Sequence, residues 1–289
     1  MAAALGLGTA QFGMNYGISN SSGKAPEPEV ARILNLAWEA GCRVLDTAAG
    51  YGDSEAVLGR LFDESRPFRI VTKTPAAAGN GGGPKIGRVF SEQLARLRRR
   101  QIYGLLVHRA SDLLGPFGAD LYRELRALKD MGFVERIGAS VYDGAEIDAL
   151  FDRFELDIVQ LPVNVFDQRL VGNSRLLRLK DRGVEIHARS AFLQGVLLLK
   201  PDELPDFLRP LAESLREFRG AAEARGMSPL QAALSFVKDL DGVAVVLVGV
   251  TQYAELEEIV AAFSGTRGFD AAPFACNDAR LVNPSLWPQ

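Results

Sequence analysis

The chain alternates short apolar runs with longer segments of helical period. Each apolar run is rich in leucine or β-branched residues and stops at a polar residue or a glycine, as buried parallel strands do. The predicted strands cover residues 5–10, 43–47, 69–74, 103–108, 136–140, 157–163, 184–190 and 243–249. The predicted helices cover residues 27–41, 53–64, 86–100, 118–131, 143–152, 174–182, 208–226, 228–239 and 252–263.

This alternation of eight strands with helices has no long linker between its halves. It predicts a closed parallel (β/α)8 barrel, or TIM barrel, formed by residues 1–289 as a single domain. A doubly wound open sheet is the structural alternative. The turn after the first strand, GTAQFGMNYG at 8–17, lacks the GxGxxG pattern of dinucleotide-binding sheets of that kind.

Local signals mark several helix ends. Asp53 is placed to cap the helix that follows it, and Ser228 with Pro229 forms a helix-start pair. Three of the predicted helices are expected to end at a glycine, at Gly41, Gly132 and Gly183.

The composition is that of an ordinary globular protein, with 47% hydrophobic and 24% charged residues among 289. A formal net charge of −3 and a pI of about 5.6 argue against nucleic-acid or membrane partners. The longest apolar run, at 243–250, is too short for a bilayer, and the N-terminus lacks the basic region of a signal peptide. RLRRR at 96–100 is expected to be a solvated helix end, and AAAGNGGGPK at 76–85 a mobile loop.

Cysteine and histidine are scarce. Cys42 and Cys276 lie far apart without metal-ligand spacing, so free thiols are expected, which fits a reducing cytoplasm. With only His108 and His187 in the chain, no metal site is expected. His187 lies inside a predicted strand and is expected to be a hydrogen-bonded core residue.

Four polar residues fall at or just beyond the carboxyl ends of three consecutive predicted strands. Asp46 ends the second strand and Tyr51 follows on its loop, Lys73 lies near the end of the third, and His108 ends the fourth. Strand ends of a parallel barrel converge on one rim, where such folds do chemistry. Taken singly, each residue has a structural explanation: Asp46 as a cap, Tyr51 as a half-buried loop aromatic, Lys73 as a solvated side chain and His108 as a packed core histidine. Together they favour a functional site.

This set has a chemical logic. A free tyrosine has a pKa of about 10, and an ammonium about 4 Å away would stabilise its phenolate by roughly 4 kcal/mol at an effective dielectric near 20. Lys73 is therefore expected to lower the pKa of Tyr51, while Asp46 keeps Lys73 charged. A neutral His108 would donate a hydrogen bond to a carbonyl oxygen as negative charge develops there. The arrangement suits protonation of a forming alkoxide, with hydride delivered by another group.

Three segments resemble the aldo-keto reductase superfamily, and the likeness covers most of the chain. They are LDTAAGYGDSEAVLG at 45–59, VTKT at 71–74 and LLVHR at 105–109. The resemblance implies that Asp46, Tyr51, Lys73 and His108 form a catalytic tetrad with Tyr51 as general acid. It also implies interconversion of a small carbonyl compound and an alcohol with NAD(P)H.

The same resemblance implies cofactor contacts at matching positions. They are Ser140, Gln160, Arg189, Ser190, Phe192, Gln194, Gly195, Gly249, Thr251, Gln252 and Glu258. The chain departs from the family pattern at Val141, where asparagine is usual, and at Arg189, where an aromatic residue normally stacks on the nicotinamide. A planar guanidinium can also stack on a ring, although its charge would repel oxidised nicotinamide.

The residue expected to face the 2′ position of the cofactor is Glu255, where many family members have arginine or glutamine, and Ile259 replaces the usual terminal asparagine. The family mostly prefers NADP(H), which is therefore the expected cofactor. An acid at 255 favours a ribose hydroxyl over a phosphate and leaves NAD(H) open. Alternatively, Glu255 points to water at a helix start, where acids are favourable.

Four aromatic residues on strand-end loops or the tail are candidates for the substrate wall, and packing is the alternative for each: Phe12, Tyr16, Phe166 and Trp287. Phe117 and Phe133 are assigned to packing. The sequence leaves the oligomeric state open.

Two other functions compete with a carbonyl reductase. A regulatory module would keep the cofactor but turn over little, and the departures at Val141 and Arg189 allow it. A Schiff-base aldolase would use Lys73 as nucleophile, although Asp46, placed to keep the amine charged, argues against it.

Overall fold

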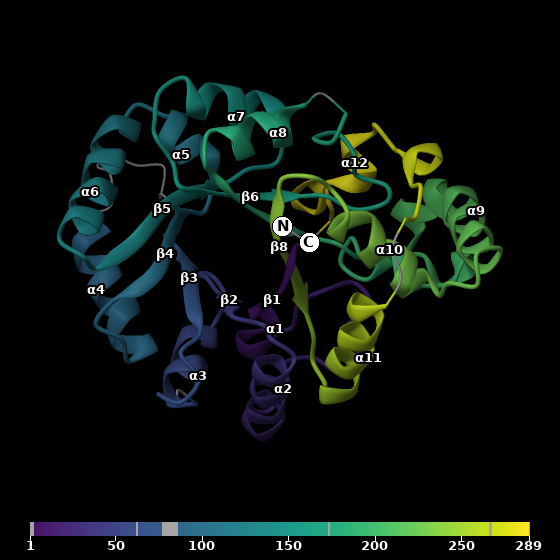
Figure 1. The fold of residues 1–289 in the computed structure, drawn as a ribbon, viewed down its shortest axis with the longest axis horizontal. Helices are drawn as coiled ribbons and strands as arrows, with labels where there is room; N and C mark the ends of the chain where they lie inside the picture. Colours follow the sequence, from purple (N-terminus) through teal and green to yellow (C-terminus); the bar gives the residue numbers. More distant parts are fainter. Residues whose placement is uncertain (1–2, 62, 77–85, 173, 266–267, 289) are drawn as a thin grey trace.

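The computed structural model describes residues 3–61, 63–76, 86–172, 174–265 and 268–288. Eight parallel strands form a closed barrel in sequence order, with β8 paired to β1, and helices surround it (Figure 1). The predicted (β/α)8 fold is confirmed, and the open-sheet alternative is excluded by that closing pair.

The eight strands are β1 (Ala4–Gly8), β2 (Val44–Asp46), β3 (Arg69–Lys73), β4 (Ile102–Val107), β5 (Val134–Ser140), β6 (Ile158–Pro162), β7 (Glu185–Arg189) and β8 (Val243–Gly249). Every one was predicted, with bounds that differ by two residues at most. Strands buried on both faces read as continuous apolar runs, so each stands out from the amphipathic helices around it.

The predicted helices also form. They are α2 (Glu27–Glu39), α3 (Ser54–Arg60), α4 (Ile86–Leu97), α6 (Gly118–Asp130), α7 (Gly144–Phe151), α8 (Arg175–Asp181), α9 (Ala212–Glu223), α10 (Pro229–Lys238) and α11 (Tyr253–Ser264). Helix α9 begins four residues later than expected, because Asp206–Leu211, which contains Pro210, forms a 3-10 helix instead.

Short helices in the loops were not predicted. They are α1 (Ala10–Gly13), α5 (Ala110–Leu114), α12 (Ala279–Val282) and the 3-10 helices Val196–Leu198, Pro201–Glu203, Ala272–Phe274 and Pro284–Leu286. Segments of three to five residues are too short to show a helical period. Several of them follow β1, β4 and β7 and shape the rim at the carboxyl ends of the strands.

The predicted helix ends are mostly observed. Ser228 caps α10 in a capping box with Gln231, and left-handed glycines follow α2, α6 and α8. Asp53 stands at the N-cap position of α3 but makes no side-chain cap. Its carboxylate instead pairs with Lys24 Nζ at 2.5 Å, which ties the loop after β1 to the loop after β2.

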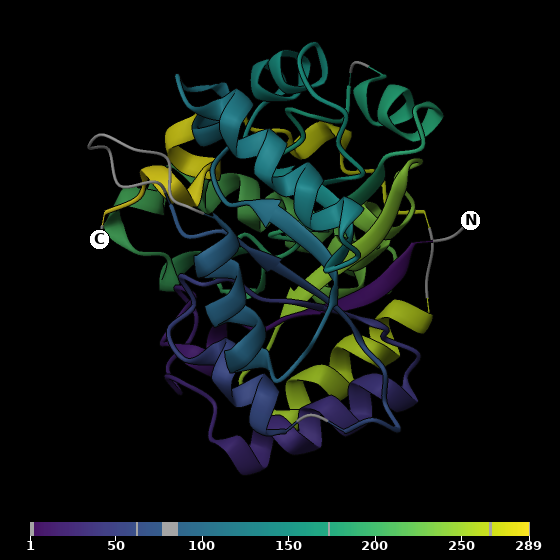
Figure 2. The same ribbon diagram turned by 90° about the vertical axis from the view of Figure 1, so that its left-hand side faces the viewer.

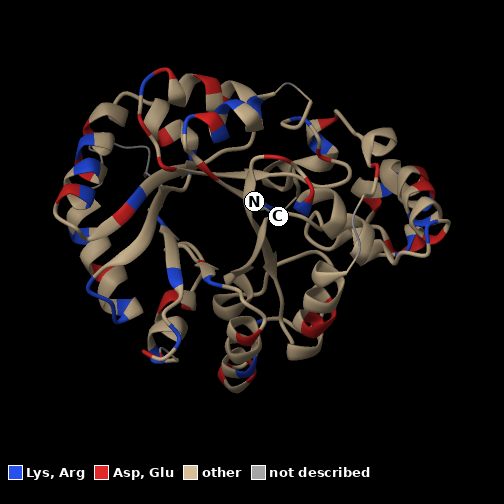
Figure 3. Ribbon diagram, in the orientation of Figure 1, with Lys and Arg blue, Asp and Glu red and all other residues tan. Residues whose placement is uncertain are grey.

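The apolar core has an inner and an outer part. The barrel interior is filled by Val44, Val71, Tyr103, Leu106, Ile158, Val245 and Leu247. A larger cluster lies between the strands and the surrounding helices. Charged residues gather on the outer helices and loops (Figure 3). Figure 2 shows the C-terminal segment on the side towards which the strand arrows point.

Other expectations concern single residues. Cys42 and Cys276 are free, and burial raises the pKa of the Cys42 thiol to about 12. His187 is fully buried and hydrogen-bonded through Nε2 to Glu185 at 2.8 Å, as predicted for a core histidine. The expected glycine-rich loop at 76–85 lies, except for its first residue, outside the described residues. Within the described ranges, no helix has the length and apolar character needed to cross a membrane.

Candidate functional site

A cavity of about 460 Å³ opens at the carboxyl ends of the strands. From β2, β3, β4 and their loops it receives the side chains of Asp46, Tyr51, Lys73 and His108. From the β8–α11 turn and helix α11 it receives Thr251, Glu255 and Glu258. The barrel thus brings the four polar rim residues to one cavity that continues towards the start of α11.

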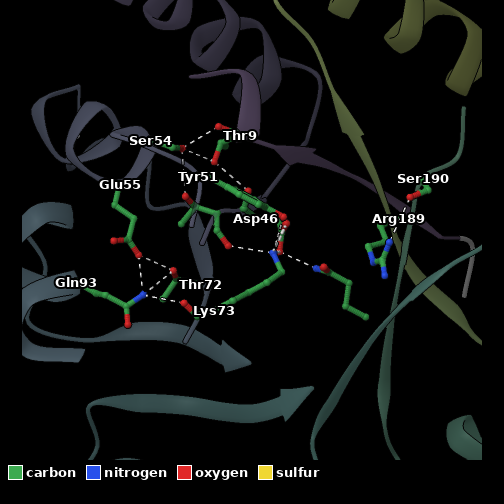
Figure 4. Close-up of polar contacts among 12 residues, drawn as sticks. Thr9, Asp46, Tyr51, Ser54, Glu55, Thr72, Lys73, Gln93, Arg189 and Ser190 are labelled. Carbon is green, nitrogen blue, oxygen red and sulfur yellow. Dashed lines mark hydrogen bonds and ion pairs between the residues drawn. The ribbon is translucent and has the colours of Figure 1, made fainter. Parts of the chain in front are cut away.

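Lys73 and Asp46 form a buried ion pair on neighbouring strands. Lys73 Nζ lies 2.7 and 2.8 Å from the two carboxylate oxygens of Asp46 and 3.0 Å from the carbonyl oxygen of Thr47 (Figure 4). These three acceptors match the three N–H donors of an ammonium group. Lys73 is 1% exposed and Asp46 4%. Burial lowers the pKa of Lys73, while the Asp46 carboxylate acts in the opposite direction.

Tyr51 lies between the lysine and the histidine. Its phenolic oxygen is 3.4 Å from Lys73 Nζ, and the ammonium nitrogen is 4.9 Å from the centre of its ring. The ring meets His108 edge to face at a centroid distance of 6.0 Å. A group bound at the phenolic oxygen would therefore have both a cation and an imidazole close by.

The pKa of Tyr51 differs from the sequence-based expectation. Burial raises it above the ordinary value of 10.0, and the charge of Asp46 raises it further. The prediction that Lys73 brings this pKa below its ordinary value is therefore wrong. Because Asp46 sits directly on the ammonium, it cancels much of the field that Lys73 would exert on the phenol.

His108 behaves as expected. Burial, followed by the nearby charge of Lys73, lowers its pKa to about 4. The imidazole is therefore uncharged at neutral pH and has one N–H to donate. A protonated imidazole would compete with Lys73 for the carboxylate of Asp46, and the uncharged ring does not.

Backbone packing against helix α1 fixes the loop that presents Tyr51. A Cβ atom added at Gly13 would meet the Tyr51 carbonyl oxygen at 1.8 Å, and one at Gly52 would meet the Gly13 carbonyl oxygen at 2.3 Å. Ser54 Oγ donates to the Thr9 carbonyl oxygen at 2.8 Å, joining α3 to the end of β1. Glycine is required where the two loops touch.

A second network supports Lys73 from outside the barrel. Glu55 accepts from Thr72 at 2.6 Å and from Gln93 at 2.8 Å, and Gln93 also donates to the Lys73 carbonyl oxygen at 3.0 Å (Figure 4). Arg96 pairs with Glu55 at 2.7 Å. Arg96 thus lies in the last turn of α4, as expected for a helix end, and it also makes an ion pair that was not predicted.

Gln160 and Ser140 line the cavity beside the ion pair. The side-chain nitrogen of Gln160 donates to Asp46 Oδ1 at 2.7 Å, so it already has a protein partner. Its carbonyl oxygen has no donor among the residues that the structure describes and remains for another group.

Arg189 also lines the cavity, at the end of β7. Its guanidinium carbon lies 4.3 Å from the ring centre of Tyr142, a residue that the sequence argument did not select. Nη2 donates to the Val141 carbonyl oxygen at 3.1 Å and Nη1 to Ser190 Oγ at 3.4 Å. The guanidinium is thus stacked on a ring that the protein itself supplies.

Most of the other residues expected to contact a cofactor line the cavity as well: Ser190, Phe192, Gln194, Gly195, Gly249, Thr251 and Glu258. Gln252 does not, and its amide nitrogen donates to Ser22 Oγ at 3.1 Å. Part of the wall after β1 was not predicted from the sequence: it is formed by Gln11 of helix α1 and by the polar loop residues Ser19, Asn20, Ser21 and Ser22. Their only signal was their position on a strand-end loop.

The start of helix α11 is capped by acids. Glu255 accepts from the backbone N–H of Thr251 at 2.6 Å and of Gln252 at 3.2 Å, and Glu29 accepts from the N–H of Tyr253 at 2.7 Å. Carboxylates therefore occupy three backbone donors of a terminus that would otherwise suit a phosphate. Glu255 is both a cap and part of the cavity wall.

Of the four aromatic residues proposed for the substrate wall, Tyr16 lines the cavity. The expectation is wrong for the other three. Phe12 and Phe166 have no exposed surface and pack in apolar clusters, and Trp287 is buried against Phe207 with ring centres 5.7 Å apart. Long loops form small apolar clusters of their own, in which large aromatic side chains are buried. A position on a loop near the rim therefore did not show which of these side chains are exposed to the cavity. Tyr142 is the aromatic residue that sequence reasoning missed.

Comparison with known proteins agrees with the fold. The sequence model described as "Aldo/keto reductase family" matches residues 4–270. A "6-dehydroglucose reductase" of Novosphingobium aromaticivorans is 26% identical over 82% of this chain and 81% of its own length. An "Aldo-keto reductase" of Mycolicibacterium vanbaalenii is 28% identical over 62% of this chain, and the match spans 64% of that relative.

Solved structures share the barrel. An aldo-keto reductase from Bacillus halodurans in its holo form superposes with a TM-score of 0.75 at 19% identity, over 100% of this chain and 95% of that one. A glycerol dehydrogenase from Gluconobacter oxydans gives a TM-score of 0.73 at 22% identity, over 100% and 94%. At these identities the likeness shows the fold.

Proposed function

Because this chain belongs to the aldo/keto reductase family of oxidoreductases, we propose that it reduces an aldehyde or ketone to an alcohol with NAD(P)H, residues 1–289 acting as one domain. The observation that carries the proposal is the cluster of Lys73, Asp46 and Tyr51 beside an uncharged His108 in one cavity. Such a cluster can polarise a carbonyl oxygen and then protonate it.

The residues present fit a nicotinamide dinucleotide. A nicotinamide cofactor would supply hydride to the carbonyl carbon. Ser140 and the free carbonyl oxygen of Gln160 are hydrogen-bonding groups next to Tyr51 and would hold the carboxamide. Ser190 and Gln194, with the hydroxyl-rich loop after β1, would hold the phosphates and riboses between that end and helix α11.

Tyr51 is the proposed proton donor and His108 orients the carbonyl oxygen. His108 donates its N–H as negative charge grows on that oxygen. Tyr51 then gives its proton, and Lys73 at 3.4 Å stabilises the phenolate that remains. The raised pKa of Tyr51 does not prevent this, because an alkoxide is the conjugate base of an alcohol, which is about as weakly acidic as water and a much weaker acid than a phenol.

The charges at helix α11 favour NAD(H) over NADP(H), in contrast to the family preference. Glu255 and Glu258 line that side of the cavity, and the lining includes no lysine or arginine there among the described residues. A 2′-phosphate would lie beside these carboxylates and compete with Glu255 for the backbone donors at Thr251 and Gln252. A ribose hydroxyl would instead have carboxylate acceptors.

A Schiff-base aldolase is disfavoured by the geometry of Lys73. Its nitrogen has three acceptors within 3.0 Å, which suits a charged ammonium without the lone pair that a nucleophile needs.

Tyr51→Phe tests the proposed function. Loss of reduced nicotinamide is followed with a panel of aldehydes and ketones, including a hydroxyaldehyde because one relative is named for a dehydrogenated sugar. The variant should lose nearly all turnover and keep cofactor affinity close to wild type. Parental turnover by Tyr51→Phe contradicts the role of Tyr51. Cofactor binding by wild type without turnover of any compound favours the regulatory module.

A further inference from the structure

We propose that Arg189 is the recognition site for a carboxylate on the substrate, so that the preferred substrates are short carbonyl compounds that carry a carboxylate. This rests on the proposed carbonyl reduction and adds a substrate class to it. The starting observation is a cation on the wall of the cavity that makes no ion pair with any carboxylate of the described residues.

The charges on this side of the cavity do not cancel. Lys73 and Asp46 neutralise one another at 2.7 Å, and His108 is uncharged at neutral pH. Arg189 is therefore left as one net positive charge. Arg189 ends β7, which pairs with β6, and Gln160 on β6 donates to Asp46, so Arg189 stands one strand away from a residue that contacts the ion pair. A half-buried charge without a counter-ion favours a bound anion.

The guanidinium is held in place for such a partner. Tyr142 supports one face of it, and the Val141 carbonyl and the Ser190 hydroxyl each take one N–H. A guanidinium has five N–H donors, so three remain. Free N–H groups at the edge of a fixed planar cation match the two oxygens of a carboxylate.

The anion could come from the substrate or from the pyrophosphate of the cofactor. Its position favours the substrate, since Arg189 stands on β7 beside β6 and its Gln160, whereas the α11 side of the wall carries Glu255 and Glu258. A carboxylate held by Arg189 would fix the distance from its carbonyl group to the Tyr51 hydroxyl. The substrate would then be selected by the spacing of its two functional groups.

The test compares kcat/KM for succinic semialdehyde and for butanal, which share four carbons and an aldehyde but differ in the carboxylate. Wild type should prefer the acid. Arg189→Gln should reduce the ratio of the two kcat/KM values by about tenfold to a hundredfold, since a charge-assisted hydrogen bond is lost. Arg189→Lys keeps the charge and should retain part of the preference even if Arg189→Gln folds poorly.

Arg109→Gln is the matched control. Arg109 follows His108, is exposed and lies outside the cavity wall, so this variant removes the same charge near the rim at a residue that does not line the cavity. Its ratio should equal that of wild type. An Arg189→Gln ratio equal to that of wild type would overturn the proposal. If that unchanged ratio of kcat/KM values is accompanied by a large loss of affinity of Arg189→Gln for ADP-ribose, Arg189 is assigned to the pyrophosphate of the cofactor instead.

A binding experiment separates this proposal from the proposed function. Succinate is titrated calorimetrically into wild type and Arg189→Gln in the presence of oxidised cofactor. If no compound of the aldehyde and ketone panel is reduced but succinate binds wild type and not the variant, the reductase proposal fails and the carboxylate site stands. If aldehydes are reduced without preference and succinate binds both proteins equally, the carboxylate site fails and the reductase stands.

Discussion

The side-chain nitrogen of Gln160 lies 2.7 Å from Asp46 Oδ1, so the carboxylate that holds Lys73 is itself held from β6, on a different part of the barrel wall. All three residues are buried. The family resemblance assigns Gln160 to the nicotinamide carboxamide, whereas the structure gives its nitrogen to the ion pair. Gln160 can serve both groups only if its carbonyl oxygen faces the cofactor.

Gln160→Met should lower the free energy of unfolding by about 1–3 kcal/mol, because a buried carboxylate oxygen loses its hydrogen-bond donor. Urea denaturation of both proteins measures the difference. Gln101→Met, at an exposed position, is the control and should change stability by about 0.5 kcal/mol or less. Equal stability of Gln160→Met and wild type would mean that the hydrogen bond to Asp46 is not formed.

Lys73→Met should destabilise the protein by about 3–5 kcal/mol, since it leaves Asp46 buried without its cation. The double variant Lys73→Met with Asp46→Asn should recover part of that loss, because no unpaired charge remains. Denaturant unfolding of the single and double variants measures the coupling. Additive effects of the two substitutions would contradict a direct ion pair.

The fold was predictable because every level of the sequence agreed on it. Strand β8, for example, is a run of seven mostly apolar residues between two amphipathic helices, and a buried parallel strand has this pattern. The four rim residues followed from the fold, since Asp46 and Lys73 end neighbouring strands whose register brings them together. The hydrophobic periodicity was enough to predict the fold, and the positions of the strand ends were enough to select the four rim residues.

The rest depended on contacts between distant loops. Nothing in the local sequence distinguishes Tyr16, which lines the cavity, from Phe12, which is fully buried four residues earlier. Arg96 looked like any other basic residue at a helix end, yet it pairs with Glu55 from another helix. The pKa of Tyr51 is raised first by its burial and then by the charge of Asp46, and sequence spacing gives neither that burial nor that proximity.

His108 should make stability depend on pH between about 6.5 and about 4. Its folded pKa of about 4 lies below the ordinary value of 6.5, so the unfolded chain binds a proton in this range and the folded chain does not. This contribution is complete above pH 6.5 and is lost as the pH falls towards 4. His108→Gln should show a flatter dependence of Tm on pH over that interval. Parallel curves for the two proteins would contradict the lowered pKa.

Gly52→Ala should displace the loop that carries Tyr51 and reduce kcat by more than tenfold, with little change in cofactor affinity. Gly52 has a φ of 57°, and an added Cβ would lie 2.3 Å from the Gly13 carbonyl oxygen, which cannot move without shifting helix α1. Gly226→Ala is the control, because its φ is 65° but no atom lies within 4 Å of the added Cβ. This control has the backbone strain of an alanine at positive φ but no steric clash, so it should be less stable than wild type and keep the turnover of wild type. Equal kcat for Gly52→Ala and wild type would show that the loop contact does not position Tyr51.

Glu255→Arg should shift the ratio of NADH to NADPH affinities towards NADPH by about tenfold or more. The substitution replaces a carboxylate on the cavity wall with a guanidinium, the group that pairs best with a phosphate, and it frees the N–H of Thr251. Loss of the cap should also cost about 1 kcal/mol of stability. Quenching of protein fluorescence on titration with each cofactor gives both Kd values without turnover.

Glu257→Arg is the control, because it makes the same change of charge at an exposed position of α11 outside the cavity wall. The ratio of its NADH and NADPH affinities should stay that of wild type. A ratio that responds equally to both substitutions would mean that the overall charge of the helix, rather than contact at residue 255, sets the preference. A ratio that responds to neither would place Glu255 away from the 2′ position.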